Sequence, residues 1–512
     1  MSRISVMQPW LGEEEVEAVA EVLRSGWVAQ GPRVAEFERR FAESQQAAHA
    51  VATSSCTTAL HLALVVAGIR PGDDVVVPSF SFVATANAAV YVGARPVFAD
   101  VSPITGNLTP ETVRAALTPA TSAVVLVDQG GVPADLDAIR EVCDPLGIVV
   151  IEDAACAAGS TYRGRPVGAG AEIAAWSFHP RKILTTGEGG MLTTSRADWA
   201  ARARRLREHA MSVSAADRHA SLVSPPESYD EVGFNFRMTD MQAAVGIVQL
   251  SRLPEVVDRR RELAAVYAKA VAEIDGLRAV TDPAWGTGNF QSFWIEVCPG
   301  PGVSTSSTTG ASAGFEVGRG TGVSTGSTTG ASAGFEVGRG TGVSTGSTTG
   351  ASAGFDVGRG TGVSTGSTTG ASAGFEVGRG TGVSTGSTTG ETAGFEVCRG
   401  TGVSTSSITG VSAGFEVCRG TGVSTRSSTV SAGGGPAYGM DREGLLGALA
   451  EAGISARRGI MAAHRQPAYV SSGVSLPVTE HLTDNTLILP LFHQMSDSEQ
   501  ARVVEVLRQG RR

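Results

Sequence analysis

The sequence predicts an α/β protein: a large domain built on a seven-stranded, mostly parallel sheet, and a smaller C-terminal α+β domain with a low-complexity insertion. Three observations lead to this prediction. Short apolar runs alternate with helical patterns from 49 to 195, which is typical of a parallel sheet covered by helices on both faces. Further strand and helix patterns follow that region. A glycine-rich repeat with a period of 20 residues interrupts them.

Composition limits the classes of function that the chain can have. It has 512 residues, with 41 basic and 50 acidic side chains and a net charge of −9. A mildly acidic chain without long basic runs is not expected to bind nucleic acid. No apolar stretch approaches the roughly 18 residues that span a bilayer, and the sequence does not open on an apolar leader, so we expect neither a membrane partner nor secretion. The six cysteines form no CxxC pair, which favours free thiols, no metal site and a cytoplasmic protein.

The predicted large domain, residues 1–275, opens with helices at 12–24 and 33–44. Acidic residues at the start of the first helix suit the positive end of a helix dipole. The strand-like runs of this domain are apolar throughout rather than alternating, as in buried parallel strands. The runs are 49–53, 74–78, 95–100, 122–128, 147–153, 172–178 and 191–195, and helical patterns follow at 198–211, 239–253 and 254–275.

The predicted small domain is formed by the two segments that flank the repeat, 276–300 and 436–512. Its patterns are a strand at 290–297 and helices at 441–453 and 496–510.

The insertion at 301–435 is typified by TGVSTGSTTGASAGFEVGRG and holds 36 of the 66 glycines of the chain. Each copy offers three sizeable apolar side chains, and their burial contributes about 5–9 kcal/mol. Ordering one copy costs about 20–40 kcal/mol of conformational entropy. We therefore expect disorder, with a stack of copies in a β-solenoid as the alternative.

Lysine usage draws attention to one residue. Of the 41 basic side chains, only Lys182 and Lys269 are lysines, and Lys269 lies in an amphipathic helix pattern typical of a surface position. Lys182 follows a strand pattern, and Asp153 ends an earlier one. Both side chains should therefore reach the edge at which parallel sheets bind ligands, although an aspartate there is as often a helix cap. An amine and a carboxylate at this edge fit pyridoxal phosphate, with the lysine forming the Schiff base and the carboxylate keeping the pyridine nitrogen protonated.

The phosphate of that cofactor needs donors at the start of a helix. The stretch ATSSCTTALHLAL places Ser55, Cys56, Thr57 and Thr58 between a strand and a helix, although hydroxyl residues are also ordinary helix caps. Phe82 follows another strand end and is a candidate for stacking on the cofactor ring, whereas the commoner role of such a phenylalanine is in the core.

With these residues in place, the sequence resembles the DegT/DnrJ/StrS family of sugar aminotransferases, which are fold-type I pyridoxal-phosphate enzymes. The resemblance covers 1–299 and 436–512, everything except the repeat. It rests on the motifs GWVAQGPRVAEFE, TTALHLAL, VPSFSFVATANA, IEDAACA, SFHPRKILTTGEGG and GFNFRMTDMQAAVG.

The resemblance implies roles in catalysis and ring binding for three residues. Lys182 would be the Schiff-base lysine and the proton shuttle. Asp153 would pair with the pyridine nitrogen, and Phe82 would stack on the ring.

It also implies how the cofactor phosphate would be held. Ser177 and Thr57, with the backbone of Cys56, would bind the phosphate. Asn235, in GFNFRMTD, would reach it from the partner subunit, so the active site would belong to a homodimer. Cys156 departs from the family pattern, which often has Gln or His near the cofactor hydroxyl. A thiol is a weaker hydrogen-bonding group than either, so the contact with the hydroxyl would differ.

The implied reaction is ping-pong transamination, with glutamate as the amino donor and a nucleotide-linked keto-deoxysugar as the acceptor. Family members that dehydrate sugars carry His in place of the lysine, and Lys182 argues against that branch. Two alternatives stay open. One is a pyridoxal-phosphate enzyme acting on a non-sugar cyclic ketone, such as an amino-cyclitol or aromatic amine precursor. The other is a catalytically inactive regulatory or binding member of the same fold.

Overall fold

The computed structural model describes residues 3–213, 226–298, 441–470 and 473–510, together with strands of the repeat between 303 and 417. The chain forms two compact units. The first comprises Met1–Cys298 and Met440–Arg512, and the second comprises Pro299–Gly439. Among the described residues, no helix is both long and apolar enough to cross a bilayer.

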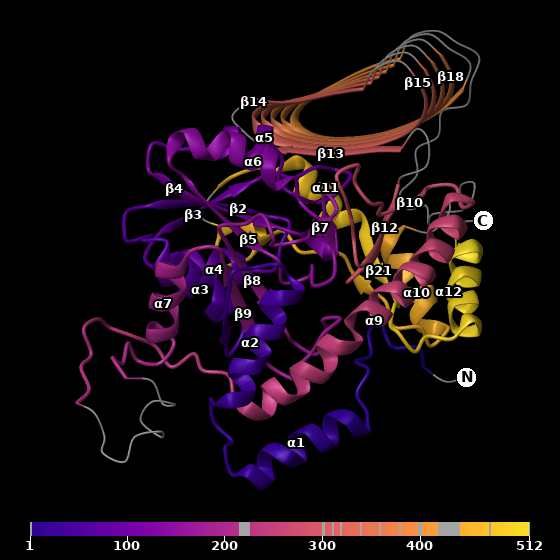
Figure 1. Ribbon diagram of the computed structural model, residues 1–512. Helices are drawn as coiled ribbons and strands as arrows, with labels where there is room; N and C mark the ends of the chain where they lie inside the picture. The colour runs from indigo at the N-terminus through magenta and orange to yellow at the C-terminus, as the bar shows by residue number, and fades with distance from the viewer. Residues whose placement is uncertain are drawn as a thin grey trace. The chain divides into compact units, whose positions relative to one another are not determined.

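The first unit is built on the predicted seven-stranded sheet, whose strand order is β1-β9-β8-β5-β4-β2-β3 (Figure 1). Strand β9 runs antiparallel to both of its neighbours, and the other neighbouring pairs are parallel. All seven predicted strands are confirmed. They are β1 (His49–Thr53), β2 (Asp74–Pro78), β3 (Arg95–Ala99), β4 (Thr121–Val127), β5 (Val149–Asp153), β8 (Ile173–Ser177) and β9 (Gly190–Thr194).

Helices cover both faces of this sheet because its strands are apolar on both sides. On β5, Val150 packs into one core cluster with α2, α5 and α6, whereas Ile151 packs into a second cluster with α3, α4 and α7. Helix α1 precedes them. The bounds are α1 (Glu13–Ser25), α2 (Pro32–Ser44), α3 (Cys56–Val66), α4 (Ala84–Tyr91), α5 (Pro110–Ala116), α6 (Leu136–Cys143) and α7 (Ala197–Leu206).

The two helices that we expected to meet at Pro254 are one helix, α9 (Asp240–Ala272). A proline inside a helix costs about 3 kcal/mol. Burial on both sides of the proline offsets this cost: Leu250 belongs to a core cluster of the large sheet, and Leu263 belongs to a third cluster with the C-terminal helices. Tertiary packing thus overrides the local signal for a break.

The C-terminal part of this unit is α+β, as predicted. Its antiparallel sheet has the order β10-β12-β21-β20. The elements are β10 (Leu277–Ala279), β12 (Phe293–Val297), α10 (Arg442–Glu451), β20 (Arg457–Arg458), η3 (Ala463–Arg465), α11 (Pro477–Asn485), β21 (Thr486–Leu489) and α12 (Asp497–Gly510). Short elements elsewhere in the unit are η1 (Gln129–Gly131), η2 (Asp144–Leu146), and a small sheet of β6 (Thr161–Tyr162), β7 (Arg165–Pro166) and β11 (Gly286–Thr287).

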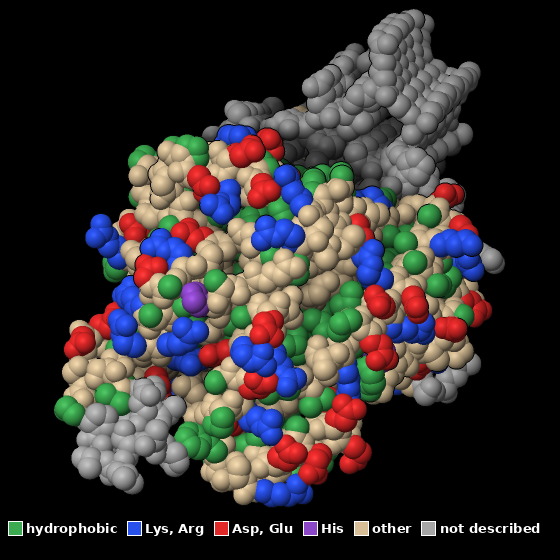
Figure 2. All heavy atoms as spheres, in the orientation of Figure 1, with side chains coloured by type: hydrophobic (Ala, Val, Ile, Leu, Met, Phe, Trp, Pro, Cys, Tyr) green, Lys and Arg blue, Asp and Glu red, His purple; other side chains and the backbone are tan. Residues whose placement is uncertain are grey.

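Acidic and basic side chains are interspersed on the face of this unit that Figure 2 shows. Some ion pairs of the unit join residues of the same helix. On α2, for example, Arg39 contacts Glu36 at 3.0 Å and Glu43 at 2.6 Å. Exposed pairs of this kind each contribute little to stability, about 0–1 kcal/mol.

The second unit differs from the disorder that composition led us to expect. Its copies lie side by side as parallel strands. Each residue pairs with the residue 20 positions later in the chain, as Val323 does with Val343 and Phe335 with Phe355. The burial estimate for a single copy left out the backbone hydrogen bonds between identical copies, which the paired strands make here. Figure 1 shows the resulting stack of similar curved strands. They are β13 (Val303–Thr309), β14 (Ser312–Val317), β15 (Gly320–Val337), β16 (Gly340–Val357), β17 (Gly360–Val377), β18 (Gly380–Val397) and β19 (Gly402–Val417).

Candidate functional site

Asp153 is the last residue of β5 and is buried at the carboxyl edge of the large sheet. Its carboxylate accepts hydrogen bonds from Thr85 Oγ1 at 2.9 Å and from the backbone nitrogen of Ala155 at 3.2 Å. Burial raises the pKa of Asp153, while these two donors and the charge of Lys182 act in the opposite direction. The carboxyl group is therefore fixed in orientation and placed close to a cation.

Lys182 lies in the connection between β8 and β9, where its backbone nitrogen donates to His179 O at 2.8 Å. Its amine Nζ lies 3.0 Å from Cys156 Sγ. Burial lowers the pKa of Lys182, but the nearby groups Cys156, Cys56 and Asp153 outweigh that effect and leave the pKa above its usual value. The structure thus brings together four of the predicted site residues.

The backbone around Lys182 is held by a side chain that our sequence analysis did not identify. Gln291 Nε2 donates to Arg181 O at 2.6 Å, and Gln291 Oε1 accepts from the nitrogen of Ile183 at 2.9 Å. These two bonds bracket the lysine on both sides. In the sequence, Gln291 is only a glutamine shortly before β12. Amide side chains are too common at such positions to indicate a role.

A second amide ties the Cys156 loop to the same segment. Asn289 Nδ2 donates to Cys156 O and to Ala158 O, each at 2.8 Å, and Asn289 Oδ1 accepts from the nitrogen of Gln291 at 2.7 Å. Gly131 makes room for this amide: a Cβ at that position would lie 1.9 Å from Asn289 Oδ1, and its φ is +93°. The thiol beside the lysine is therefore positioned by the segment that also positions the lysine.

The predicted phosphate-binding residues also lie together. Ser55 caps α3 by accepting from the nitrogen of Thr58 at 3.2 Å. Cys56 and Thr57 form the first turn of this helix, where amides have no intrahelical acceptor. Gly190 of β9 lies against this turn, since a Cβ there would approach the nitrogen of Cys56 to 2.6 Å.

Ser177 belongs to the same group of residues because of strand pairing. It is the last residue of β8 and pairs with Gly190 in the β8–β9 register. Ser177 is therefore next to the residue that packs against the start of α3. The close approach of β9 and α3 requires a glycine at 190.

Phe82 and Asn235 are more open than the other predicted site residues. The Phe82 side chain is 58% exposed and precedes α4, the helix that carries Thr85. Asn235 is exposed, and its neighbour Phe236 accepts from the nitrogen of Ser54 at 2.8 Å. Ring stacking by Phe82 and delivery of Asn235 from a partner subunit stay predictions.

The loop before Phe82 is clamped by a buried histidine. His464 Nδ1 lies 2.6 Å from Ser79 Oγ, and His464 Nε2 lies 3.3 Å from Glu480 Oε1. Ser79 is fully buried, so this serine, histidine and glutamate hold the fold together and do not form a nucleophilic triad. Burial lowers the pKa of His464, which favours the neutral imidazole.

Comparison with known proteins identifies relatives of this chain. A family model described as the DegT/DnrJ/EryC1/StrS aminotransferase family matches residues 9–302 and 432–508. The spore coat polysaccharide biosynthesis protein SpsC of Bacillus subtilis (strain 168) is 45% identical over 269 residues, which are 52% of this chain and 69% of SpsC. The dTDP-4-dehydro-2,3,6-trideoxy-D-glucose 4-aminotransferase of Saccharopolyspora spinosa is 42% identical over 304 residues, which are 58% of this chain and 78% of that enzyme.

Solved structures share the fold. The aminotransferase TlmJ from Streptoalloteichus hindustanus has a TM-score of 0.66 at 29% identity, covering 99% of this chain and 98% of TlmJ. The sugar aminotransferase CalS13 from Micromonospora echinospora also has a TM-score of 0.66, at 21% identity, and covers 99% of this chain and 100% of CalS13. The second likeness is one of fold alone.

Proposed function

The chain belongs to the DegT/DnrJ/EryC1/StrS aminotransferase family, and from this premise we propose that it moves an amino group from glutamate to a nucleotide-linked keto-deoxysugar. It is a pyridoxal-phosphate-dependent aminotransferase by membership of the family. The observation that carries the proposal is the placement of the Lys182 amine and the Asp153 carboxyl at one sheet edge, close enough for each charge to act on the other.

The residues present fit pyridoxal phosphate. The first-turn amides at Cys56 and Thr57 suit a phosphate, because the start of a helix offers free N–H groups and a positive dipole end. Gly190 lets β9 pack directly against that turn, since a Cβ there would lie 2.4 Å from the backbone of Ser55. Lys182 would attach the cofactor, Asp153 would hold the proton of the pyridine nitrogen, and Ser177 would add a hydroxyl to the phosphate site.

When bound, the cofactor supplies an electron sink for the substrate carbon that carries the amino group. Asp153 would maintain that sink by keeping a negative charge against the pyridine N–H. Lys182 Nζ would be the general base and acid that moves the proton of the substrate carbon. To act as a base it must first lose its own proton, since the surrounding groups keep its pKa high before substrate binds.

The acceptor class is supported by the relatives. The enzyme from Saccharopolyspora spinosa is named for a dTDP-linked dehydro-trideoxyglucose, and SpsC is named for polysaccharide biosynthesis. A keto group on a nucleotide-linked sugar is therefore the acceptor that we propose. We further propose a cytoplasmic homodimer in which Asn235 of one subunit completes the phosphate site of the other.

An acceptor screen tests this function. The purified holoenzyme is incubated with glutamate and a panel of keto acceptors, and the release of 2-oxoglutarate is measured. We expect turnover with nucleotide-linked keto-deoxysugars and none with cyclic non-sugar ketones. Turnover confined to keto-cyclitols would support the alternative substrate class. No turnover with any acceptor would support the hypothesis that the protein is a catalytically inactive regulatory member of the same fold. Either result would overturn the proposal.

A further inference from the structure

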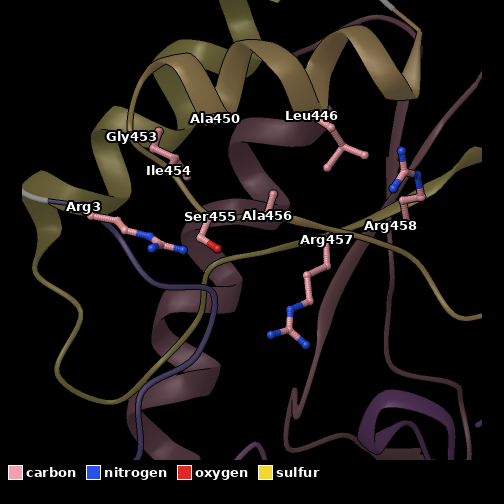
Figure 3. A pocket seen from close by; sticks show the side chains of 9 residues that line it. All are labelled: Arg3, Leu446, Ala450, Gly453, Ile454, Ser455, Ala456, Arg457 and Arg458. Carbon is pink, nitrogen blue, oxygen red and sulfur yellow. The ribbon is translucent and has the colours of Figure 1, made fainter.

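A cavity of about 740 Å³ lies at the edge of the C-terminal sheet, away from the residues described above. It is bordered by α10, by the segment leading into β20 and by the start of the chain (Figure 3). It shares no lining residue with the Lys182 site. The lining residues are Arg3, Leu446, Ala450, Gly453, Ile454, Ser455, Ala456, Arg457 and Arg458.

Backbone pairing fixes the walls of this cavity. The nitrogen of Ile4 donates to Gly453 O at 3.0 Å, and the nitrogen of Ser455 donates to Ile4 O at 2.8 Å. Ile4 is completely buried, so the start of the chain is anchored and Arg3 is held beside Ser455. Strand β20 is an edge strand of its sheet, which leaves this side open to a ligand.

The side chains on β20 alternate between two sides of the strand. Figure 3 shows Ser455 and Arg457 extending on one side of this segment and Arg458 on the other side, toward α10, whereas Arg3 comes from the start of the chain and lies beside Ser455. Arg458 is occupied by Glu443, with its guanidinium 2.6 Å from the carboxylate. Among the ion pairs between described residues, none involves Arg3 or Arg457. Two positive charges thus border the cavity without an ion pair to any described carboxylate.

The carbonyl oxygens at the C-terminal end of α10, which would repel an anion, already accept hydrogen bonds within the protein. The C-terminal end of α10 carries negative dipole charge on its free carbonyls. Here the nitrogen of Ile454 donates to Leu449 O at 2.8 Å, and the nitrogen of Gly453 donates to Ala450 O at 2.9 Å. Arg502 Nη2 donates to Ala452 O at 2.7 Å. These bonds reduce the repulsion that the helix end would exert on a bound anion.

We infer that this cavity binds a phosphorylated small molecule. The guanidinium groups of Arg3 and Arg457 would hold the phosphate oxygens, since the planar fork of arginine matches them, and the Ser455 hydroxyl would donate a further bond. A volume of about 740 Å³ is in the usual range for small-ligand sites and leaves room for an organic group beside the phosphate. The site lies outside the reaction centre, and its occupation does not require the proposed function to be correct.

The test uses inorganic pyrophosphate as the probe and isothermal titration calorimetry of the full-length, cofactor-loaded protein. We expect saturable binding to the wild type and at least tenfold weaker binding to the double variant Arg3→Gln, Arg457→Gln. The matched control is Arg508→Gln, which removes an exposed arginine that pairs with Glu273 and does not line the cavity. It should keep its affinity within about twofold.

A second variant keeps the test decisive if the double variant folds poorly. Ser455→Asp places a carboxylate between the two free arginines, and we expect it to weaken pyrophosphate binding at least as much. Circular dichroism melts verify that each variant is folded. Equal affinities in the wild type, the double variant and Ser455→Asp would overturn the inference, as would an absence of any binding to the wild type. A loss in Arg508→Gln equal to that in the double variant would also overturn it.

Discussion

Thr85 is the single side chain that donates to the Asp153 carboxylate, alongside one backbone amide, in the described part of the chain. It is buried on α4 and comes from a segment far from Asp153 in sequence. The bond stabilises the ionised carboxylate against the cost of burial. The proposed role of Asp153 in holding the pyridine proton would therefore depend on a residue that our sequence analysis did not single out, although it lies in the motif VPSFSFVATANA.

Replacing this threonine should loosen the cofactor. We expect Thr85→Val to raise the pKa of Asp153 further and to weaken pyridoxal-phosphate binding by tenfold or more, because hydrogen bonds to charged groups contribute about 1.5–3 kcal/mol. As the pH falls, the variant should lose the cofactor at a higher pH than the wild type. Fluorescence titration of the cofactor across pH measures both effects.

The control is Thr85→Ser, which keeps the hydroxyl and should remain close to the wild type. If Thr85→Val and Thr85→Ser bind the cofactor equally well at every pH, the hydrogen bond has no such role.

The sequence allowed some residues of the site to be predicted and not others, for a physical reason. Lys182 could be found because it is rare and follows a strand, and Asp153 because it ends a buried strand. Gln291 and Asn289 could not, because their bonds join segments more than 100 positions apart and amide residues are common in loops.

At the level of secondary-structure elements, hydrogen bonds join the segment between β20 and α11 to the loop after β2. Phe80 forms a bridge with Ala462, and the nitrogen of Ala463 donates to Ser79 O at 2.8 Å. His464 adds the buried bond to Ser79. This loop leads to Phe82, so the fastening also sets the position of the residue that we expect to contact the cofactor ring.

The stability that the His464 contacts give to the folded protein should depend on pH. Burial lowers the pKa of His464 in the folded state, with Glu480 and Asp100 acting to raise it and Arg465 to lower it. The unfolded chain then binds a proton more readily than the folded protein below about pH 6.5, the ordinary histidine pKa. Stability should therefore fall as the pH falls below about 6.5.

Thermal melts between neutral and mildly acidic pH measure this effect. We expect His464→Phe to be less stable than the wild type at neutral pH by about 1–3 kcal/mol, since Ser79 and Glu480 lose a partner. This variant should also lose part of the acid sensitivity. Identical pH slopes in the wild type and in His464→Phe would contradict a neutral histidine in the clamp.

Secondary structure was largely predictable where the apolar pattern was long and continuous. All seven strands of the large sheet lie where the pattern placed them, to within about two residues. The break expected at Pro254 failed because α9 buries side chains on both sides of the proline. The repeat departed from expectation because its pairing is between copies, which composition within one copy does not reveal.

At the scale of the whole molecule, the family match leaves out the repeat. The family model matches residues 9–302 and 432–508. The chain folds into two units, of which the first contains nearly all of these segments and the second contains the insertion. The residues proposed for catalysis all lie in the first unit. We therefore assign the chemistry to that unit, where it would depend on one covalent attachment point, Lys182.

Mapping the attachment point of the cofactor tests this claim most directly. The full-length holoenzyme is reduced with borohydride, which fixes pyridoxal phosphate to the lysine that holds it, and the digested peptides are analysed by mass spectrometry. The chain makes the result unambiguous because it has only two lysines, Lys182 and Lys269. We predict the added mass on the peptide with Lys182 and none on that with Lys269. Added mass on Lys269, or on neither lysine in a preparation that still transfers amino groups, would contradict the account.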